Sequence, residues 1–270
     1  MYDYTSINPS ILIGEVPLNE QLRRVVEAGF TGVELWWPFH VADPPRTEVD
    51  VFLGTFAESG LALVGLNSYE GGMAEGNRGI ACWPAVDLEF DATIETAARI
   101  ASETGCPAVN VLHGVRRPDE PAELQDARAA ERTARAADRL SAYGLAVTIE
   151  QLSHISGYGL RSASDVLAAL ERTRAHVTSG TVLIQVDLFH MFQMNDDVAA
   201  FFRAHWRDIG HVQVADAPGR GAPGTGVQPI DELLDLLISL GYERGIALEY
   251  SDFKGDDPFA GVRRNRRDLQ

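Results

Sequence analysis

Four polar side chains stand inside or at the ends of short apolar segments in the second half of the chain. They are Glu150 in TIEQ, Asp187 in IQVD, Gln213 in HVQ and Glu249 in ALEY. An unpaired carboxylate is costly to bury in such surroundings. No lysine and little arginine lie nearby in the sequence to neutralise these acids. Either each acid is satisfied by an arginine or a backbone amide, or the group binds a cation.

The donor types indicate which cation this would be. Three carboxylates and one amide oxygen form an all-oxygen shell, which suits Mg²⁺ or Mn²⁺ better than Zn²⁺. A cation held in this way acts as a Lewis acid and stabilises negative charge that develops on a substrate oxygen. We therefore expect Glu150, Asp187, Gln213 and Glu249 to bind one divalent cation, Mg²⁺ or Mn²⁺.

These residues must be brought together by a repeating pattern of elements. Strand-like apolar runs occur at residues 11–14, 32–37, 61–67, 108–113, 145–151, 182–187, 211–216 and 246–250. Amphipathic stretches lie between them, most clearly at 18–29, 87–105 and 230–241. The alternation predicts an α/β fold, a (β/α)₈ TIM barrel, as a single domain over residues 1–270. A doubly wound sheet is the rival, but the glycine fingerprint expected after its first strand is missing.

Local signals agree with this assignment. Ser162 and Asp165 have the spacing of a capping box, and glycines stand where helices should end, at Gly29, Gly60, Gly105, Gly144 and Gly241. A long loop is expected at 68–86, and the eighth helix is expected to be degenerate. In a barrel, chemistry comes from the C-terminal ends of the strands. Those positions hold Glu34, Trp37, Asn67, His113, Glu150, Asp187, Gln213 and Glu249.

Composition excludes several classes of protein. The formal charge of −16 argues against binding to nucleic acid, and the basic cluster RRNRR at 263–267 reads as a solvated tail. No apolar run reaches the roughly 20 residues that span a bilayer, and the start of the chain lacks the pattern of a signal peptide. With only two cysteines, Cys82 and Cys106, the chain is expected to be cytoplasmic. The sequence leaves open whether it forms a homo-oligomer.

Five segments give the sequence a family resemblance. They are GLNSYEGGMAEGNRGIACWP (65–84), TIEQLS (148–153), QVDLFHMF (185–192), HVQVADAPGRGAPGTG (211–226) and GYERGIALEY (241–250). In these the chain resembles the hydroxypyruvate isomerase family of the xylose-isomerase-like barrels. The resemblance implies that the four residues above bind the metal and that Glu150 and Glu249 also transfer protons. It implies substrate contacts for His190 and Arg220, and we expect Asn67 and His113 to bind substrate as well.

The reaction this resemblance implies is an aldose–ketose isomerisation through an enediolate. The small hydroxy-carbonyl substrate would be hydroxypyruvate and its product tartronate semialdehyde. A ketose 3-epimerase and a 2-oxo-tetronate isomerase remain alternatives, because the same metal and two glutamates serve them. A metal-dependent hydrolase or dehydratase is less favoured, since a multi-zinc phosphodiesterase needs several histidine ligands. A non-catalytic binding protein is the remaining class.

The rest of the pocket is less well defined by the sequence. Lys254 is the only lysine, so a Schiff base inside the barrel is excluded. A substrate carboxylate would need arginine, with Arg220 the first choice and Arg78 and Arg116 behind it. The Gly-rich segment 211–226 could cradle a phosphate, as loops at this place in barrels often do. We instead favour a loop that closes over the substrate and carries Arg220.

Overall fold

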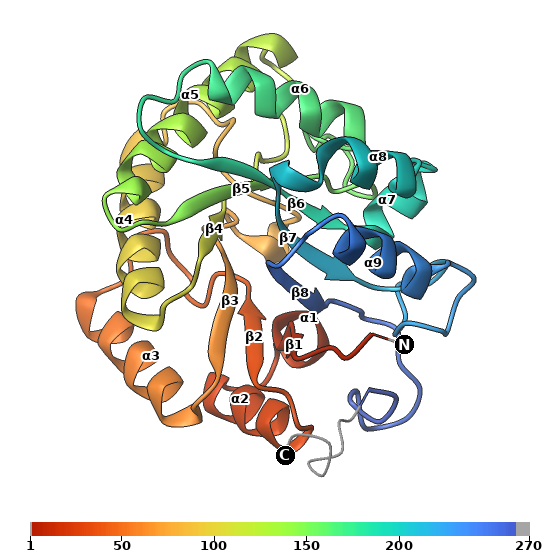
Figure 1. The fold of residues 1–270 in the computed structure, drawn as a ribbon. Coiled ribbons are helices and arrows are strands. Elements are labelled where there is room, and N and C mark those ends of the chain that lie inside the picture. Colours follow the sequence, from red (N-terminus) through yellow and green to blue (C-terminus); the bar gives the residue numbers. More distant parts are fainter. Residues whose placement is uncertain (1, 263–270) are drawn as a thin grey trace.

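The computed structural model describes residues 2–262 and contains a closed parallel barrel with strands in the order β1 to β8 (Figure 1). The strands are β1 (Ser6–Ile7), β2 (Gly32–Leu35), β3 (Ala62–Asn67), β4 (Ala108–Asn110), β5 (Ala146–Glu150), β6 (Val182–Asp187), β7 (Ile209–Val214) and β8 (Gly245–Leu248). β1 pairs with both β2 and β8, which closes the sheet. The predicted (β/α)₈ barrel is confirmed. The basic cluster at 263–267 lies outside the described residues.

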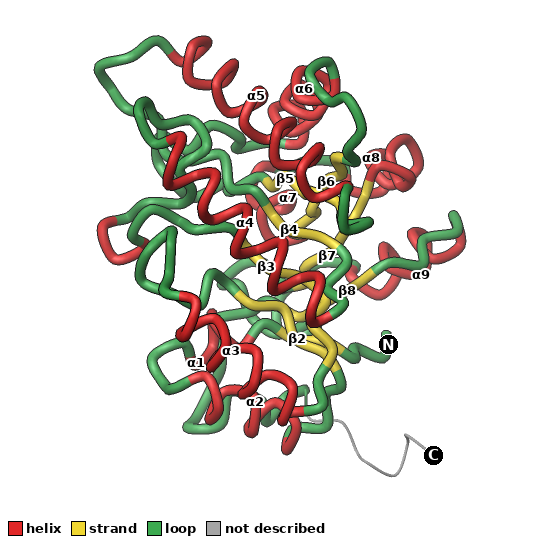
Figure 2. The backbone as a smooth tube through the Cα atoms, turned by 90° about the vertical axis from the view of Figure 1, so that its left-hand side faces the viewer, coloured by secondary structure: helices red, strands yellow, loops and turns green. Residues whose placement is uncertain are grey.

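Helices surround the barrel, as the ring in Figure 1 and the side view in Figure 2 show. They are α1 (Pro9–Ile13), α2 (Leu18–Glu27), α3 (Arg46–Ser59), α4 (Asp87–Thr104), α5 (Ala122–Ser141), α6 (Ala163–Arg174), α7 (Leu188–Met194), α8 (Val198–His205) and α9 (Ile230–Ser239). The predicted helices at 18–29, 87–105 and 230–241 correspond to α2, α4 and α9. No helix within residues 2–262 combines the length and apolarity needed to cross a bilayer.

The first strand is the one element that the sequence misplaced. Residues 11–14 were expected to form it, but Pro9–Ile13 is helix α1 and the strand is Ser6–Ile7. The Asn8 side chain accepts a hydrogen bond from the Ser10 amide (3.0 Å) and so caps the helix, and Pro9 fits its first turn. The prediction was wrong because a four-residue apolar run has no periodicity that separates a strand from a buried helix.

The predicted helix boundaries are present. Ser162 and Asp165 form a reciprocal capping box at the start of α6. Gly60 and Gly105 follow α3 and α4 with φ of 68° and 73°, the left-handed conformation that glycine adopts without strain. After β8, residues 249–262 contain no regular helix.

The barrel interior is unusually polar at its C-terminal end. Glu34 on β2 reaches across the barrel to His211 and Gln213 on β7, strands that are not neighbours in the sheet. Glycines make room for these side chains. A Cβ on Gly65 would lie 3.0 Å from Cγ of Glu34, and one on Gly245 would lie 2.8 Å from Nδ1 of His211. At this end of the barrel, buried polar side chains therefore occupy space that apolar side chains would otherwise fill.

The loop after β3, residues 68–86, is held against α5 by a buried arginine. Arg132 donates to the carbonyl oxygens of Ala81 (3.0 Å) and Trp83, and it forms an ion pair with Asp87 (2.9 Å). Its side chain is only 2% exposed. Buried carbonyl groups need partners, so this one guanidinium fixes the course of the loop above the barrel.

Replacing Arg132 with methionine should lower the free energy of unfolding by about 3–5 kcal/mol, because the carbonyls and Asp87 lose a buried partner. Urea denaturation would measure the change. Arg135→Met is the matched control: Arg135 pairs with the same Asp87 from the same helix, but its side chain is 43% exposed. The control should change stability by less than about 1 kcal/mol. Equal losses in the two variants would contradict the assigned role of Arg132.

Candidate functional site

A cavity of about 450 Å³ opens at the C-terminal end of the barrel. It is lined by Ile11, Trp36, Asn67, Met73, Arg78, Leu112, Glu150, Leu152, His154, Ile155, Phe189, His190, Arg220, Glu249 and Ser251. Six of the residues that the sequence singled out line it: Asn67, Arg78, Glu150, His190, Arg220 and Glu249. This is the end at which barrels carry their chemistry.

The two glutamates are held by side-chain amides and an indole. Glu150 Oε2 accepts hydrogen bonds from Nδ2 of Asn110 (2.7 Å) and Nε2 of Gln185 (3.1 Å). Glu249 Oε1 accepts from Nδ2 of Asn8 (2.9 Å) and Nε1 of Trp36 (3.0 Å). Each carboxylate therefore has one oxygen fixed by neutral donors, which orients it without neutralising its charge.

Arg220 supplies the positive charge that the sequence did not place near these acids. Its Nη2 donates to Asp187 Oδ2 (2.8 Å) and to Glu249 Oε2, and its Nε donates to the Glu249 carbonyl (3.2 Å). Little arginine lies near these acids along the chain, but the loop after β7 folds back over the barrel and brings Arg220 to them. In this structure two of the four predicted metal ligands are thus paired with an arginine.

Burial dominates the electrostatics of the acids. It raises the pKa of Glu150 well above its usual value, and the carboxylates of Glu249 and Asp187 raise it further. Burial raises the pKa of Glu249 to about 8, although Arg220 opposes the shift. Burial also raises the pKa of Asp187, and the charge of Arg220 partly opposes this shift. One arginine leaves the group short of positive charge, so it favours a bound proton or cation.

Several atoms of the cluster fit a cation. One ligand atom from each of Glu150, Asp187 and His190 lies within 4.8 Å of the others. Two buried side-chain atoms here, Nε2 of the same His190 and Oε1 of Gln213, have no hydrogen-bond partner in the described part of the chain. Burial lowers the pKa of His190 well below its usual value, so its ring is neutral. Its Nδ1 accepts from the Ser153 amide (3.3 Å), and its Nε2 lies 3.4 Å from Asp187 Oδ2. The residues present therefore fit a divalent cation, with His190 beside the carboxylates.

Glu34 links the cluster to the barrel core. Its Oε1 accepts from Nδ2 of Asn8 (3.0 Å) and from Nε2 of Gln213, and its Oε2 lies 2.6 Å from Nε2 of His211. Because the amide nitrogen of Gln213 is bound to Glu34, the amide oxygen is left for another partner. Asn8 joins Glu34 to Glu249 through the same side-chain nitrogen. Glu34 is therefore a positioning residue for both groups.

Sequence reasoning missed most of these supporting groups. Glu34 was noted at a strand end but given no role, and Asn8, Trp36, Asn110 and Gln185 were not singled out. A usable signal existed: each is a polar or indole side chain inside or beside an apolar strand, on the inward side of the alternation. It was lost for Asn8 because the first strand was misplaced.

The Gly-rich loop folds around an aspartate. Asp216 Oδ2 accepts from the amides of Gly224 (2.9 Å) and Gly226 (2.9 Å), and its Oδ1 accepts from the amide of Gln228 (3.2 Å). The backbone N–H groups that could cradle a phosphate are thus taken by a carboxylate. This favours the expected alternative, in which the loop carries Arg220 to the cavity.

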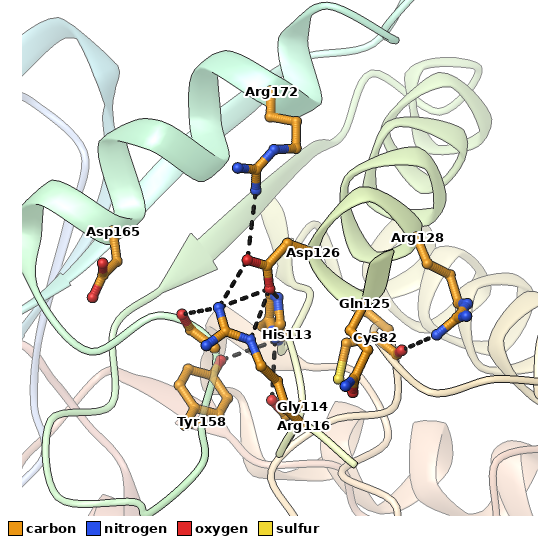
Figure 3. A network of polar contacts seen from close by, with 12 residues as sticks. Cys82, His113, Gly114, Arg116, Gln125, Asp126, Arg128, Tyr158, Asp165 and Arg172 are labelled. Carbon is orange, nitrogen blue, oxygen red and sulfur yellow. Dashed lines mark hydrogen bonds and ion pairs between the residues drawn. The ribbon is translucent and has the colours of Figure 1, made fainter. Parts of the chain in front are cut away.

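His113 lies outside the cavity, in the polar network of Figure 3. Its Nε2 is 3.1 Å from Asp126, which also binds Arg116 (2.8 Å). The Tyr158 hydroxyl accepts from the His113 amide (3.0 Å) and donates to the Glu150 carbonyl (3.3 Å). The structure therefore does not bring the His113 ring to the other predicted site residues. Arg116 is likewise occupied by Asp126.

Several known proteins are similar in sequence to this chain over most of its length. A "Putative hydroxypyruvate isomerase" of Streptomyces coelicolor is 39% identical over 263 residues, covering 94% of this chain and 92% of that protein. Hydroxypyruvate isomerase of Escherichia coli is 29% identical, with 91% and 92% covered. More distant relatives are named 2-oxo-tetronate isomerase. The names of these relatives are those of isomerases, which agrees with the enzyme class that the sequence predicts.

A solved structure also matches over nearly the whole chain. It is described as an AP endonuclease, family 2, from Brucella melitensis, and it has a TM-score of 0.83 at 26% identity, covering 98% of this chain and all of that one. The family model for the xylose isomerase-like TIM barrel matches residues 22–268. By this family model and by the relatives above, the chain belongs to the xylose isomerase-like TIM barrel family.

Proposed function

We propose that this protein is a metal-dependent isomerase that converts hydroxypyruvate to tartronate semialdehyde. The observation that carries the proposal is the pair Glu150 and Glu249, two buried and separately oriented carboxylates that line one cavity. The names of the relatives support this reaction.

The chain's own residues would divide the work of the reaction. One glutamate removes a proton from the hydroxymethyl carbon of hydroxypyruvate, and the other returns a proton to the neighbouring carbon, while a proton moves between the two oxygens. The raised pKa of Glu249, about 8, suits a group that gives and takes a proton near neutral pH. Glu150, Asp187, Gln213 and Glu249 would hold the Mg²⁺ or Mn²⁺, with His190 beside them. That cation would supply Lewis-acid stabilisation of the developing oxyanion.

A 2-oxo-tetronate isomerase is the second candidate. Its substrate is one carbon longer, and a cavity of about 450 Å³ has room for either acid. A ketose 3-epimerase fits less well, because much of the lining is apolar: Ile11, Met73, Leu112, Leu152, Ile155 and Phe189. A sugar with many hydroxyl groups would place several of them against these apolar side chains.

The direct test is NMR of hydroxypyruvate in D₂O with metal-stripped protein, with and without added Mg²⁺ or Mn²⁺. We expect metal-dependent formation of tartronate semialdehyde with deuterium at C2. Turnover of a 2-oxo-tetronate but not of hydroxypyruvate would favour the second candidate. No exchange with any carbonyl compound would reject the isomerase.

Glu150→Gln and Glu249→Gln should each lower kcat by about 10²–10⁴-fold, since each removes a group that accepts a proton. Steady-state kinetics would measure the effect. Glu243→Gln, at an exposed glutamate shortly before β8, is the control and should keep normal kcat. Near-normal kcat in either active-site variant would show that the roles are assigned wrongly.

Glu34→Gln should weaken Mn²⁺ binding by about 10–100-fold, because a residue that orients a metal ligand contributes this much to affinity. The new amide could donate to Oε1 of Gln213 and turn that oxygen away from the metal. Calorimetric titration of Mn²⁺ into metal-stripped protein measures the affinity without depending on turnover, again with Glu243→Gln as the control. Unchanged Mn²⁺ affinity in a folded Glu34→Gln variant would contradict the positioning role.

A further inference from the structure

The cavity contains two arginines in different electrostatic states. Arg220 is already paired: its guanidinium donates to Asp187 and Glu249. Its charge therefore balances the acid cluster and is poorly available to a substrate carboxylate. This changes the order of preference that the sequence suggested, in which Arg220 came first.

Arg78 lies in the loop after β3 and lines the same cavity. Within residues 2–262, its guanidinium makes hydrogen bonds only through Nη1, to the carbonyl oxygens of Met73 (3.2 Å) and Asn77 (2.6 Å). Those two bonds fix the direction of the side chain but leave its charge unbalanced. Nε and Nη2 remain for a ligand, and a planar guanidinium with two such edges suits a carboxylate.

The acid whose charge acts on Arg78 is only partly ionised near neutral pH. The nearby acid is Glu70, and burial raises its pKa to about 7, so it is partly neutral at physiological pH. Burial lowers the pKa of Arg78 itself; Glu70 opposes this shift, and Arg220 adds to it. His154, which also lines the cavity, has its pKa lowered by burial, Arg220 and Arg78. Positive groups thus face this part of the cavity from two loops, and an anion there would relieve their repulsion.

We propose that Arg78 binds the carboxylate of the substrate and so selects a short 2-oxo acid over a neutral ketose. The reacting carbons then lie toward Glu150 and Glu249, and the acid group lies toward the loop. The inference rests on the proposed function, because it names the part of the substrate that Arg78 recognises. It also assigns the loop held by Arg132 a role in specificity.

Hydroxypyruvate and dihydroxyacetone form a matched pair for the test, since they differ only in a carboxylate in place of a hydroxymethyl group. Arg78→Gln should lower kcat/KM for hydroxypyruvate by about 100-fold, mainly through KM, because a charged hydrogen-bonded pair is lost. The kcat/KM for dihydroxyacetone should change less than threefold. Arg78→Lys, which keeps the charge but not the planar fork, should fall between wild type and Arg78→Gln.

Arg117→Gln is the control, because it removes the same charge from an exposed arginine that stacks on Trp83 and does not line the cavity. It should keep the wild-type preference for the acid. An equal loss on both substrates in Arg78→Gln would mean that Arg78 only supports the loop, and no loss on either would remove it from the site. Both results would overturn the inference.

A binding measurement separates this inference from the proposed reaction. Glycerate carries the carboxylate but has no carbonyl, so it cannot be isomerised. Calorimetry should show glycerate binding to wild type and at least tenfold weaker binding to Arg78→Gln, with glycerol binding to neither. If wild type turns over neither substrate, the proposed reaction fails, yet Arg78-dependent glycerate binding still supports the carboxylate site. Equal glycerate affinity in the two proteins overturns it.

Discussion

The structure depends on keeping four acids buried at one end of the barrel. Glu34, Glu150, Asp187 and Glu249 are each at most 3% exposed. Charged groups in such a place are stable only when they are paired and hydrogen-bonded. The chain meets this requirement with one arginine and a set of neutral donors on other strands. Asn8, Asn110 and Gln185 each donate to one or two of the acids. The polar interior, the glycines beside it and the folded-back loop after β7 all follow from that requirement.

The loops above the barrel are fastened by the same means, a buried polar group that satisfies several backbone groups at once. In the loop after β3, Arg132 donates hydrogen bonds to backbone carbonyls. In the loop after β7, Asp216 accepts hydrogen bonds from backbone amides. Tyr158 joins the segments that follow β4 and β5. Loops held in this way can carry Arg78 and Arg220 at defined positions, because their backbone has few alternative partners. The helices contribute the closed scaffold, and these anchors contribute the geometry of the cavity.

The sequence was informative where a pattern repeats and weak where a contact is made across the fold. Strands β5 to β8 were found because each is an apolar run with a polar residue inside it or next to its end, and this also singled out Glu150 and Glu249. The ion pairs of Arg220 could not be read from the sequence, because they require a loop to return over the barrel. His113 shows the opposite limit: its place after a strand was identified, but the direction of its ring depends on Asp126 in α5. A position along the chain does not fix the direction of a side chain.

The balance of charge explains why one arginine cannot both neutralise the acid cluster and bind the carboxylate of the substrate. Arg220 offsets only part of the charge that the four acids would carry, and the raised pKa values of Glu150 and Glu249 reflect that shortage. A divalent cation would bring the cluster close to neutrality and would leave no excess positive charge. An anionic substrate entering such a site would still meet desolvated carboxylates, so its own carboxylate needs a separate cation at a distance from them. Arg78, fixed by carbonyl groups and placed on another loop, meets that condition, whereas moving Arg220 to the substrate would expose Asp187 and Glu249 to each other.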